Sequence, residues 1–158
     1  LADRDTVVLY GQNSRLDSLQ AVVGNRLISE THPIADGRIA NATRYDQGLA
    51  DLGEYVKIPP RKPGVKQVYH TYVIQASDRD GLLKHLEAQE IEAKVHYPIP
   101  MHLQKASHYL GYKKGDFPVC ERQCGTILSL PVHQHLSPEQ VDWAIGQVHE
   151  YYSGKGGD

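Results

Sequence analysis

The residues best placed to do chemistry are His96, Tyr97 and His102. The first two end a run that alternates like a strand, and Pro98 and Pro100 stiffen the corner that follows. Imidazole and phenol rings held at the carboxyl end of a strand can bind an anion, a sugar or a metal ion. The three residues by themselves do not decide among an anion, a sugar and a metal ion.

Other reactive side chains and motifs give weaker evidence for a functional site. Ser14 and Ser129 lack the glycine context of a nucleophile elbow and have no marked His and acid partner nearby, which argues against a serine nucleophile. The chain has no G-x-x-x-x-G-K and no G-x-G-x-x-G after a strand, so the usual phosphate loops of nucleotide enzymes are missing. Cys120 and Cys124 have no second pair of thiols, and we interpret them as structural or incidental.

A metal site would have to combine His96, His102, His133 and His135. Their spacing matches no recognised ligand pattern. We therefore predict no metal site, and a histidine-based metal protein remains a third alternative that metal analysis of the purified chain would test.

The composition is that of a soluble chain of one domain. Its 158 residues are 40% hydrophobic and 23% charged, with a net charge of −2. A chain of this size can bury about 70% of its unfolded surface, and no apolar run approaches the roughly 18 residues of a membrane span. Lysine and arginine are dispersed, without a basic stripe. We expect a cytoplasmic protein without nucleic-acid or membrane partners, and Leu1 in place of Met suggests a piece of a longer chain.

One helix start and one strand carry expectations about individual residues. Ser14 is expected to cap a helix beginning at Arg15 or Leu16, whose amino end would suit a phosphate or carboxylate. The run 68–74 predicts a strand with His70 on a sheet face. The further expected elements are a β-prone run at 6–10, helices over 33–49, 77–89, 102–110, 118–124 and from 138, and strands at 55–58, 93–97 and 126–131.

This element order predicts an α+β fold. We expect one two-layer domain with a small, mainly antiparallel sheet of three to four strands covered by helices. The domain would span residues 1–153, including an entry segment 1–15, and residues 154–158 would form a disordered tail.

Seven short motifs, in this order and spacing, make the chain resemble the DegT/DnrJ/EryC1/StrS family. That family comprises pyridoxal-phosphate-dependent aminotransferases that act on nucleotide-linked keto-sugars. The resemblance runs from about Tyr10 to Tyr152 and implies the small, carboxyl-terminal domain of a fold-type I aminotransferase. The motifs are GQNSRLD at 11–17, LQA at 19–21, YHTY at 69–72, RD at 79–80, HYPIPMHLQ at 96–104, FPVCE at 117–121 and LSLP at 128–131.

The resemblance also implies roles for individual residues. Asn13 matches the asparagine that reaches the cofactor phosphate of the other subunit of the family's homodimer, and Arg15 would lie beside it. His96 and Tyr97 match positions near the nucleotide-sugar entrance, whereas His102 fits the pattern as a substrate-binding residue or shapes the corner alone.

The resemblance places the catalytic machinery outside this chain. The family holds pyridoxal phosphate on a lysine upstream of the G-x-N-S-R turn, and no lysine here lies in such a setting, so no catalytic residue and no bound cofactor are expected in the chain alone. The first interpretation is an inactive carboxyl-terminal domain that needs its amino-terminal cofactor domain to aminate a nucleotide-linked keto-sugar, with glutamate as donor. The alternative is a free-standing, non-catalytic binding or regulatory module derived from such a domain.

Overall fold

The computed structural model describes residues 5–11, 13 and 16–154. At its centre lies a three-stranded antiparallel sheet in the order β1-β2-β3. The strands are β1 (Val56–Lys57), β2 (Tyr72–Ala76) and β3 (Ile127–Leu130). In the register of the longer pair, Tyr72 faces Leu130 and Gln75 faces Ile127. The predicted α+β class with a small antiparallel sheet is confirmed.

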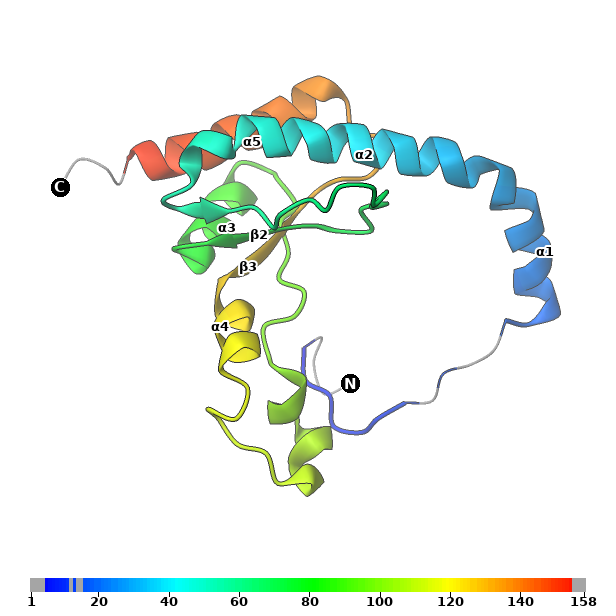
Figure 1. Cartoon of the computed structure of the whole chain (residues 1–158), viewed down its shortest axis with the longest axis vertical. Coiled ribbons are helices and arrows are strands. Elements are labelled where there is room, and N and C mark those ends of the chain that lie inside the picture. The colour runs from blue at the N-terminus through cyan, green and yellow to red at the C-terminus, as the bar shows by residue number, and fades with distance from the viewer. Residues whose placement is uncertain (1–4, 12, 14–15, 155–158) are drawn as a thin grey trace.

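Helices pack on this sheet and extend beyond it (Figure 1). Helix α5 lies along α2 above the sheet, and α3 packs against α5, β2 and β3. In this view α1 lies at the far end of α2, away from the sheet, while α4 and two short 3-10 helices hang below it. The helices are α1 (Ser18–Leu27), α2 (Thr31–Gly48), α3 (Arg79–Ala88), α4 (Pro118–Thr126) and α5 (Pro138–Ser153), with 3-10 helices η1 (Ile28–Glu30), η2 (Ala50–Leu52), η3 (Met101–Leu103) and η4 (Lys105–Leu110).

One hydrophobic core joins these elements. Its fully buried side chains come from the sheet and from the three helices packed on it: Tyr45, Leu49, Tyr72, Ile74, Leu82, Leu86, Leu128, Val141 and Val148. Tyr45 and Tyr72 stack with ring centroids 4.9 Å apart. The Tyr72 hydroxyl donates to Asp46 Oδ1 at 2.8 Å, so this buried hydroxyl is satisfied.

Local signals correctly located the best-marked helices. The Ser137 side chain accepts the Gln140 N–H while the Gln140 side chain accepts the Ser137 N–H, and Pro138 occupies the first turn of α5. Helix α4 likewise begins at Pro118, as predicted.

The first helix starts later than predicted. Helix α1 begins at Ser18, and its N-cap is Asp17, whose carboxylate accepts the Gln20 N–H at 2.8 Å. The predicted cap, Ser14, lies outside the described residues. Because an aspartate fills the cap, the positive end of this helix already faces a carboxylate, which weakens the expectation that it binds an anion.

The strand expected over 68–74 was wrong in its first half. Tyr69 has φ 49°, which breaks the extended backbone, and the Arg38 guanidinium binds the carbonyl oxygens of Tyr69 and His70 instead. His70 is exposed, so it is not the sheet-face histidine that we expected. The hydrogen-bonded pairing of β2 with β3 also ends at Tyr72 and Leu130, because Pro131, which follows Leu130, has no N–H to donate.

Two further predicted elements have a different form. The β-prone run 6–10 is not a strand, and only Lys94 of the expected strand 93–97 pairs with β3, through an isolated bridge to Ser129. The helix expected over 102–110 is the pair η3 and η4. Of the predicted tail, residues 155–158 lie outside the described residues.

Candidate functional site

The corner that carries His96 and Tyr97 is attached to β3 by its first residues. Lys94 and Ser129 exchange two backbone hydrogen bonds, of 3.0 and 2.8 Å. The Ser129 hydroxyl then lies 2.9 Å from His96 Nδ1 and fixes the imidazole ring. Tyr97 packs edge-on against this ring, with centroids 5.8 Å apart, and 67% of its surface is exposed. The corner therefore presents a phenol beside an imidazole whose orientation is set by β3.

The residues after the corner hold the amino-terminal segment of the chain. The Gln104 side chain accepts the Val7 N–H at 2.8 Å and donates to the Asp5 carbonyl oxygen at 2.9 Å. The Ala106 N–H donates to the Val7 carbonyl oxygen at 2.9 Å. These bonds account for the missing strand, because the 5–10 segment pairs with a side chain and a 3-10 helix in place of a sheet edge. We call residues 5–10 the strap.

A cavity of about 500 Å³ lies between the strap, the corner and α4. His96, Tyr97 and Met101 form the wall on the corner, and Val7 and Asp5 contribute from the strap. From α4 the wall is completed by Cys120, Gln123 and Cys124, and from β3 by Ile127. The structure thus brings His96 and Tyr97 together on one mainly apolar cavity with a few polar groups, which is the usual make-up of a small-molecule site.

The two cysteines of this cavity are free thiols. Burial, together with the neighbouring Cys120 thiol, raises the pKa of Cys124. Cys124 therefore stays protonated at neutral pH, which agrees with its interpretation as a structural residue.

His102 does not line this cavity. Its side chain is buried, its ring lies 4.7 Å from that of Phe117, and its Nε2 is 3.0 Å from Glu121 Oε1. The Glu121 carboxylate also accepts the N–H groups of Gly115 and Phe117. This placement favours the role in shaping the corner that the sequence left open, over direct substrate contact.

Replacing Glu121 by Gln is expected to destabilise the chain in a pH-dependent way. Burial acts to raise the pKa of Glu121, but hydrogen bonds from Gly115, Phe117 and His102 outweigh it and hold the pKa below its ordinary value of 4.5. Because the folded pKa is depressed, the stabilisation is present above the unfolded pKa and is lost as pH falls through the folded value. The melting temperature of Glu121→Gln should therefore fall at pH 7 and approach that of the parent chain in acid.

The exposed Glu54 provides the control for this measurement, since Glu54→Gln removes the same charge without these bonds. An equal Tm difference at every pH for Glu121→Gln would contradict the assignment.

The two residues expected at a cofactor phosphate lie elsewhere. Asn13 is exposed, between the strap and α1, and Arg15 lies outside the described residues. Asn13 is not among the residues that line the His96 cavity.

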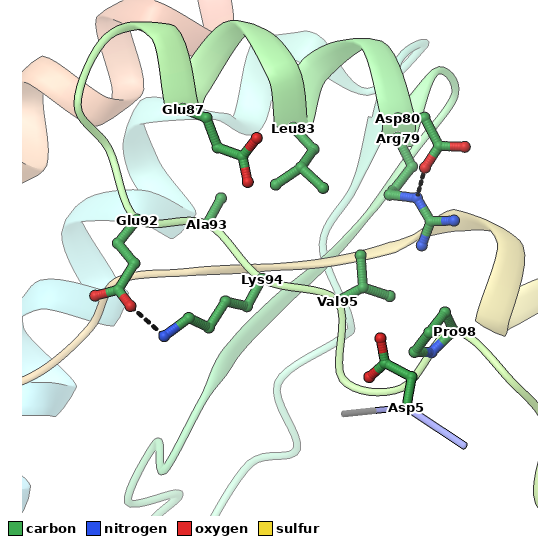
Figure 2. Close-up of a pocket in the computed structure, with 10 residues that line it drawn as sticks. All are labelled: Asp5, Arg79, Asp80, Leu83, Glu87, Glu92, Ala93, Lys94, Val95 and Pro98. Atoms are coloured by element: carbon green, nitrogen blue, oxygen red, sulfur yellow. Dashed lines mark hydrogen bonds and ion pairs between the residues drawn. The ribbon is translucent and has the colours of Figure 1, made fainter. Parts of the chain in front are cut away.

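A second cavity, of about 340 Å³, lies between α3 and the 92–95 segment, and it is also lined by Asp5 and Pro98 (Figure 2). Its two cations are already paired, Arg79 with Asp80 at 2.5 Å and Lys94 with Glu92. Glu87 and Asp5 add further negative charge to the wall. This cavity is poorly suited to an anionic substrate.

Among residues 5–11, 13 and 16–154, no group of three or more His, Cys, Asp or Glu side chains is placed to hold a metal ion. No helix within these ranges combines the length and apolar character needed to cross a membrane.

Sequence reasoning missed Gln104 and Ser129 as parts of the site. Gln104 stands in the corner stretch, but nothing local shows that its amide holds a segment 97 residues away. Ser129 was considered as a nucleophile, whereas its hydroxyl orients His96.

Comparison of the sequence with known proteins finds matches that extend over most of the chain. The model of the DegT/DnrJ/EryC1/StrS aminotransferase family matches residues 2–149. A pleiotropic regulatory protein of Geobacillus stearothermophilus is 35% identical over 145 residues, which are 91% of this chain and 39% of the relative. A dTDP-3-amino-3,4,6-trideoxy-alpha-D-glucose transaminase of Micromonospora megalomicea subsp. nigra is 35% identical over 147 residues, with the same coverage.

Solved structures share the fold. The crystal structure of DesV from S. venezuelae, in complex with a ketimine intermediate, superposes with a TM-score of 0.82 at 34% identity and covers 89% of this chain and 38% of that one. An aminotransferase from Brucella abortus superposes with a TM-score of 0.77 at 35% identity, covering 89% and 37%. The chain thus spans about two fifths of the length of the relatives that it matches.

Proposed function

Because the chain belongs to the DegT/DnrJ/EryC1/StrS aminotransferase family, we propose that it is the carboxyl-terminal domain of a pyridoxal-phosphate-dependent enzyme that aminates a nucleotide-linked keto-sugar. The observation that carries this proposal is the family match over almost the whole chain, combined with coverage of only 39% of the sugar transaminase from Micromonospora. Glutamate is the proposed amino donor, and the chain alone is proposed to be inactive.

The surface of α1 supports the proposal that a further domain or subunit covers this chain. Its apolar stripe of Leu19, Val22, Val23 and Leu27 recurs at helical spacing, yet each of these side chains is between 51% and 76% exposed. None of the residues of α1 is buried. A stripe of this kind is characteristic of a helix that packs on something else, and we propose the amino-terminal cofactor domain or the second subunit of a homodimer.

In this proposal the residues of the chain bind and orient. The His96 and Tyr97 rings form the wall on which the nucleotide-sugar rests, with His96 held in place by Ser129. Asn13, exposed on the segment before α1, donates its amide N–H to the cofactor phosphate of the other subunit, with Arg15 beside it. Pyridoxal phosphate, when bound in the intact protein, supplies the electron sink for transfer of the amino group.

The absence of a cofactor lysine gives a direct test of the proposal. The chain is incubated with pyridoxal phosphate and reduced with borohydride, which makes any lysine Schiff base permanent, and its intact mass is measured. We expect weak, scattered labelling of surface lysines and no near-stoichiometric single adduct, because the cofactor lysine is proposed to lie upstream. The intact parent protein, treated in the same way, should gain one adduct. A clean single adduct on this chain would show that it holds the cofactor itself.

A further inference from the structure

A groove lined by residues of the 89–92 turn and of α5 shares no lining residue with the His96 cavity. The groove has a volume of about 500 Å³ and lies between the turn after α3, the loop after β3 and the first two turns of α5. This volume falls within the range of small-ligand sites.

The floor of the groove is apolar and carries the only tryptophan of the chain. Ile91 and Ala144 are buried beneath it, and Leu136 packs against the core at its side. Trp143 also lines the groove, and 53% of its surface is exposed. A large aromatic side chain that remains half-exposed beside a cavity offers its ring face to a partner.

The rim of the groove is acidic. Glu90, Glu92 and Glu139 line it, and none of its lining residues is Lys or Arg. Glu92 is held by Lys94, so its charge is already balanced. Within the described residues, no side-chain hydrogen bond or ion pair engages the Glu90 carboxylate. Glu139 lies in the first turn of α5 beside Ser137, whose hydroxyl, by hydrogen bonding, lowers the pKa of Glu139 and keeps it ionised at neutral pH.

We propose that this groove binds an arginine side chain of a partner protein, with apolar residues beside the arginine on the groove floor. A guanidinium stacks on an indole face and pairs with a carboxylate through parallel N–H donors, and Trp143, Glu90 and Glu139 all line this groove. The cavity is larger than one guanidinium and its floor is apolar, so the complementary occupant is a peptide segment and not a free amine. This site goes beyond the proposed aminotransferase function and does not depend on it.

The single tryptophan allows binding to be measured on the 158-residue chain without labels. The probe is an acetylated and amidated peptide, Gly-Leu-Arg-Leu-Gly, titrated while Trp143 fluorescence is recorded. The matched control peptide carries citrulline in place of arginine and keeps the shape without the charge. We expect saturable quenching with the arginine peptide, weakened by salt, and little or none with the citrulline peptide.

Two substitutions distinguish binding in the groove from a general attraction of the arginine peptide to negative charge on the chain. Glu90→Gln is expected to weaken binding by about fivefold, whereas Glu87→Gln, on α3 outside the groove, should leave it unchanged. Equal binding of both peptides, or equal weakening by Glu87→Gln and Glu90→Gln, would overturn the proposal. So would a change in Trp143 fluorescence with protein concentration alone, because a second copy would then fill the groove.

Discussion

Gly81→Ala is expected to lower the free energy of unfolding of the chain by about 2 kcal/mol. Gly81 lies in the first turn of α3, where a Cβ would come within 2.0 Å of the Tyr151 hydroxyl oxygen and 2.6 Å of Asp78 Oδ2. Those two atoms form a 2.6 Å hydrogen bond between α5 and the residue before α3. Asp78 is also the N-cap of α3, because its Oδ1 accepts the Gly81 N–H at 3.1 Å.

The added methyl group therefore disturbs a helix cap and a contact between two helices at once. Loss of an N-cap costs about 1 kcal/mol, and loss of a hydrogen bond to a carboxylate costs roughly 1.5–3 kcal/mol. The better helix propensity of alanine offsets up to about 1 kcal/mol of this destabilisation. Urea denaturation followed by circular dichroism measures the net change in the free energy of unfolding.

Gly146 provides a matched control with the opposite sign. It lies in α5, and a Cβ there meets nothing within 4 Å, so Gly146→Ala should raise stability by up to about 1 kcal/mol through helix propensity. The double variant Gly81→Ala with Tyr151→Phe should be less destabilised than the sum of the single variants, because the phenylalanine removes the atom that clashes. Strict additivity would contradict the proposed cause.

The fold was predictable where its signals were local. The cap of α5 depends on Ser137 and Gln140, three residues apart, and could be predicted from the sequence alone. The start of β2 could not, because Tyr69 leaves the extended conformation while Arg38, 31 residues earlier, binds its carbonyl oxygen. Capping at α1 was ambiguous: Ser14 and Asp17 are both good caps with a suitable partner three residues later, and the structure uses Asp17.

The candidate site was predictable in part, for the same physical reason. His96 and Tyr97 are adjacent in sequence and stand directly before the prolines that stiffen the corner, so their location side by side could be predicted without knowledge of the tertiary structure. The strap and α4, which complete the cavity, reach it through contacts such as that between Val7 and Gln104, which no local pattern encodes. His102 lies six residues from His96, yet η3 turns it toward Glu121 and away from the cavity.

Asn13→Ala in the intact parent protein is expected to weaken pyridoxal phosphate binding by about 10- to 100-fold, the loss that follows removal of one hydrogen bond to a charged group. The proposed amide–phosphate contact crosses to the other subunit, and Asn13 is exposed and does not line the His96 cavity of its own chain. Fold stability should not change, since Asn13 is exposed and no hydrogen bond within the described residues involves its side chain.

Equilibrium dialysis, followed by the cofactor's absorbance, measures this loss, and Asn25→Ala serves as the control. Asn25 is also exposed and lies on α1 opposite its apolar stripe, so its replacement should leave cofactor binding unchanged. Because the contact is proposed to cross between subunits, an Asn13→Ala chain that keeps its cofactor lysine, paired with a chain that keeps Asn13 but lacks that lysine, should bind one cofactor with wild-type affinity. Weakened binding at that single site would place the contact within one subunit and contradict a contact across the subunit interface.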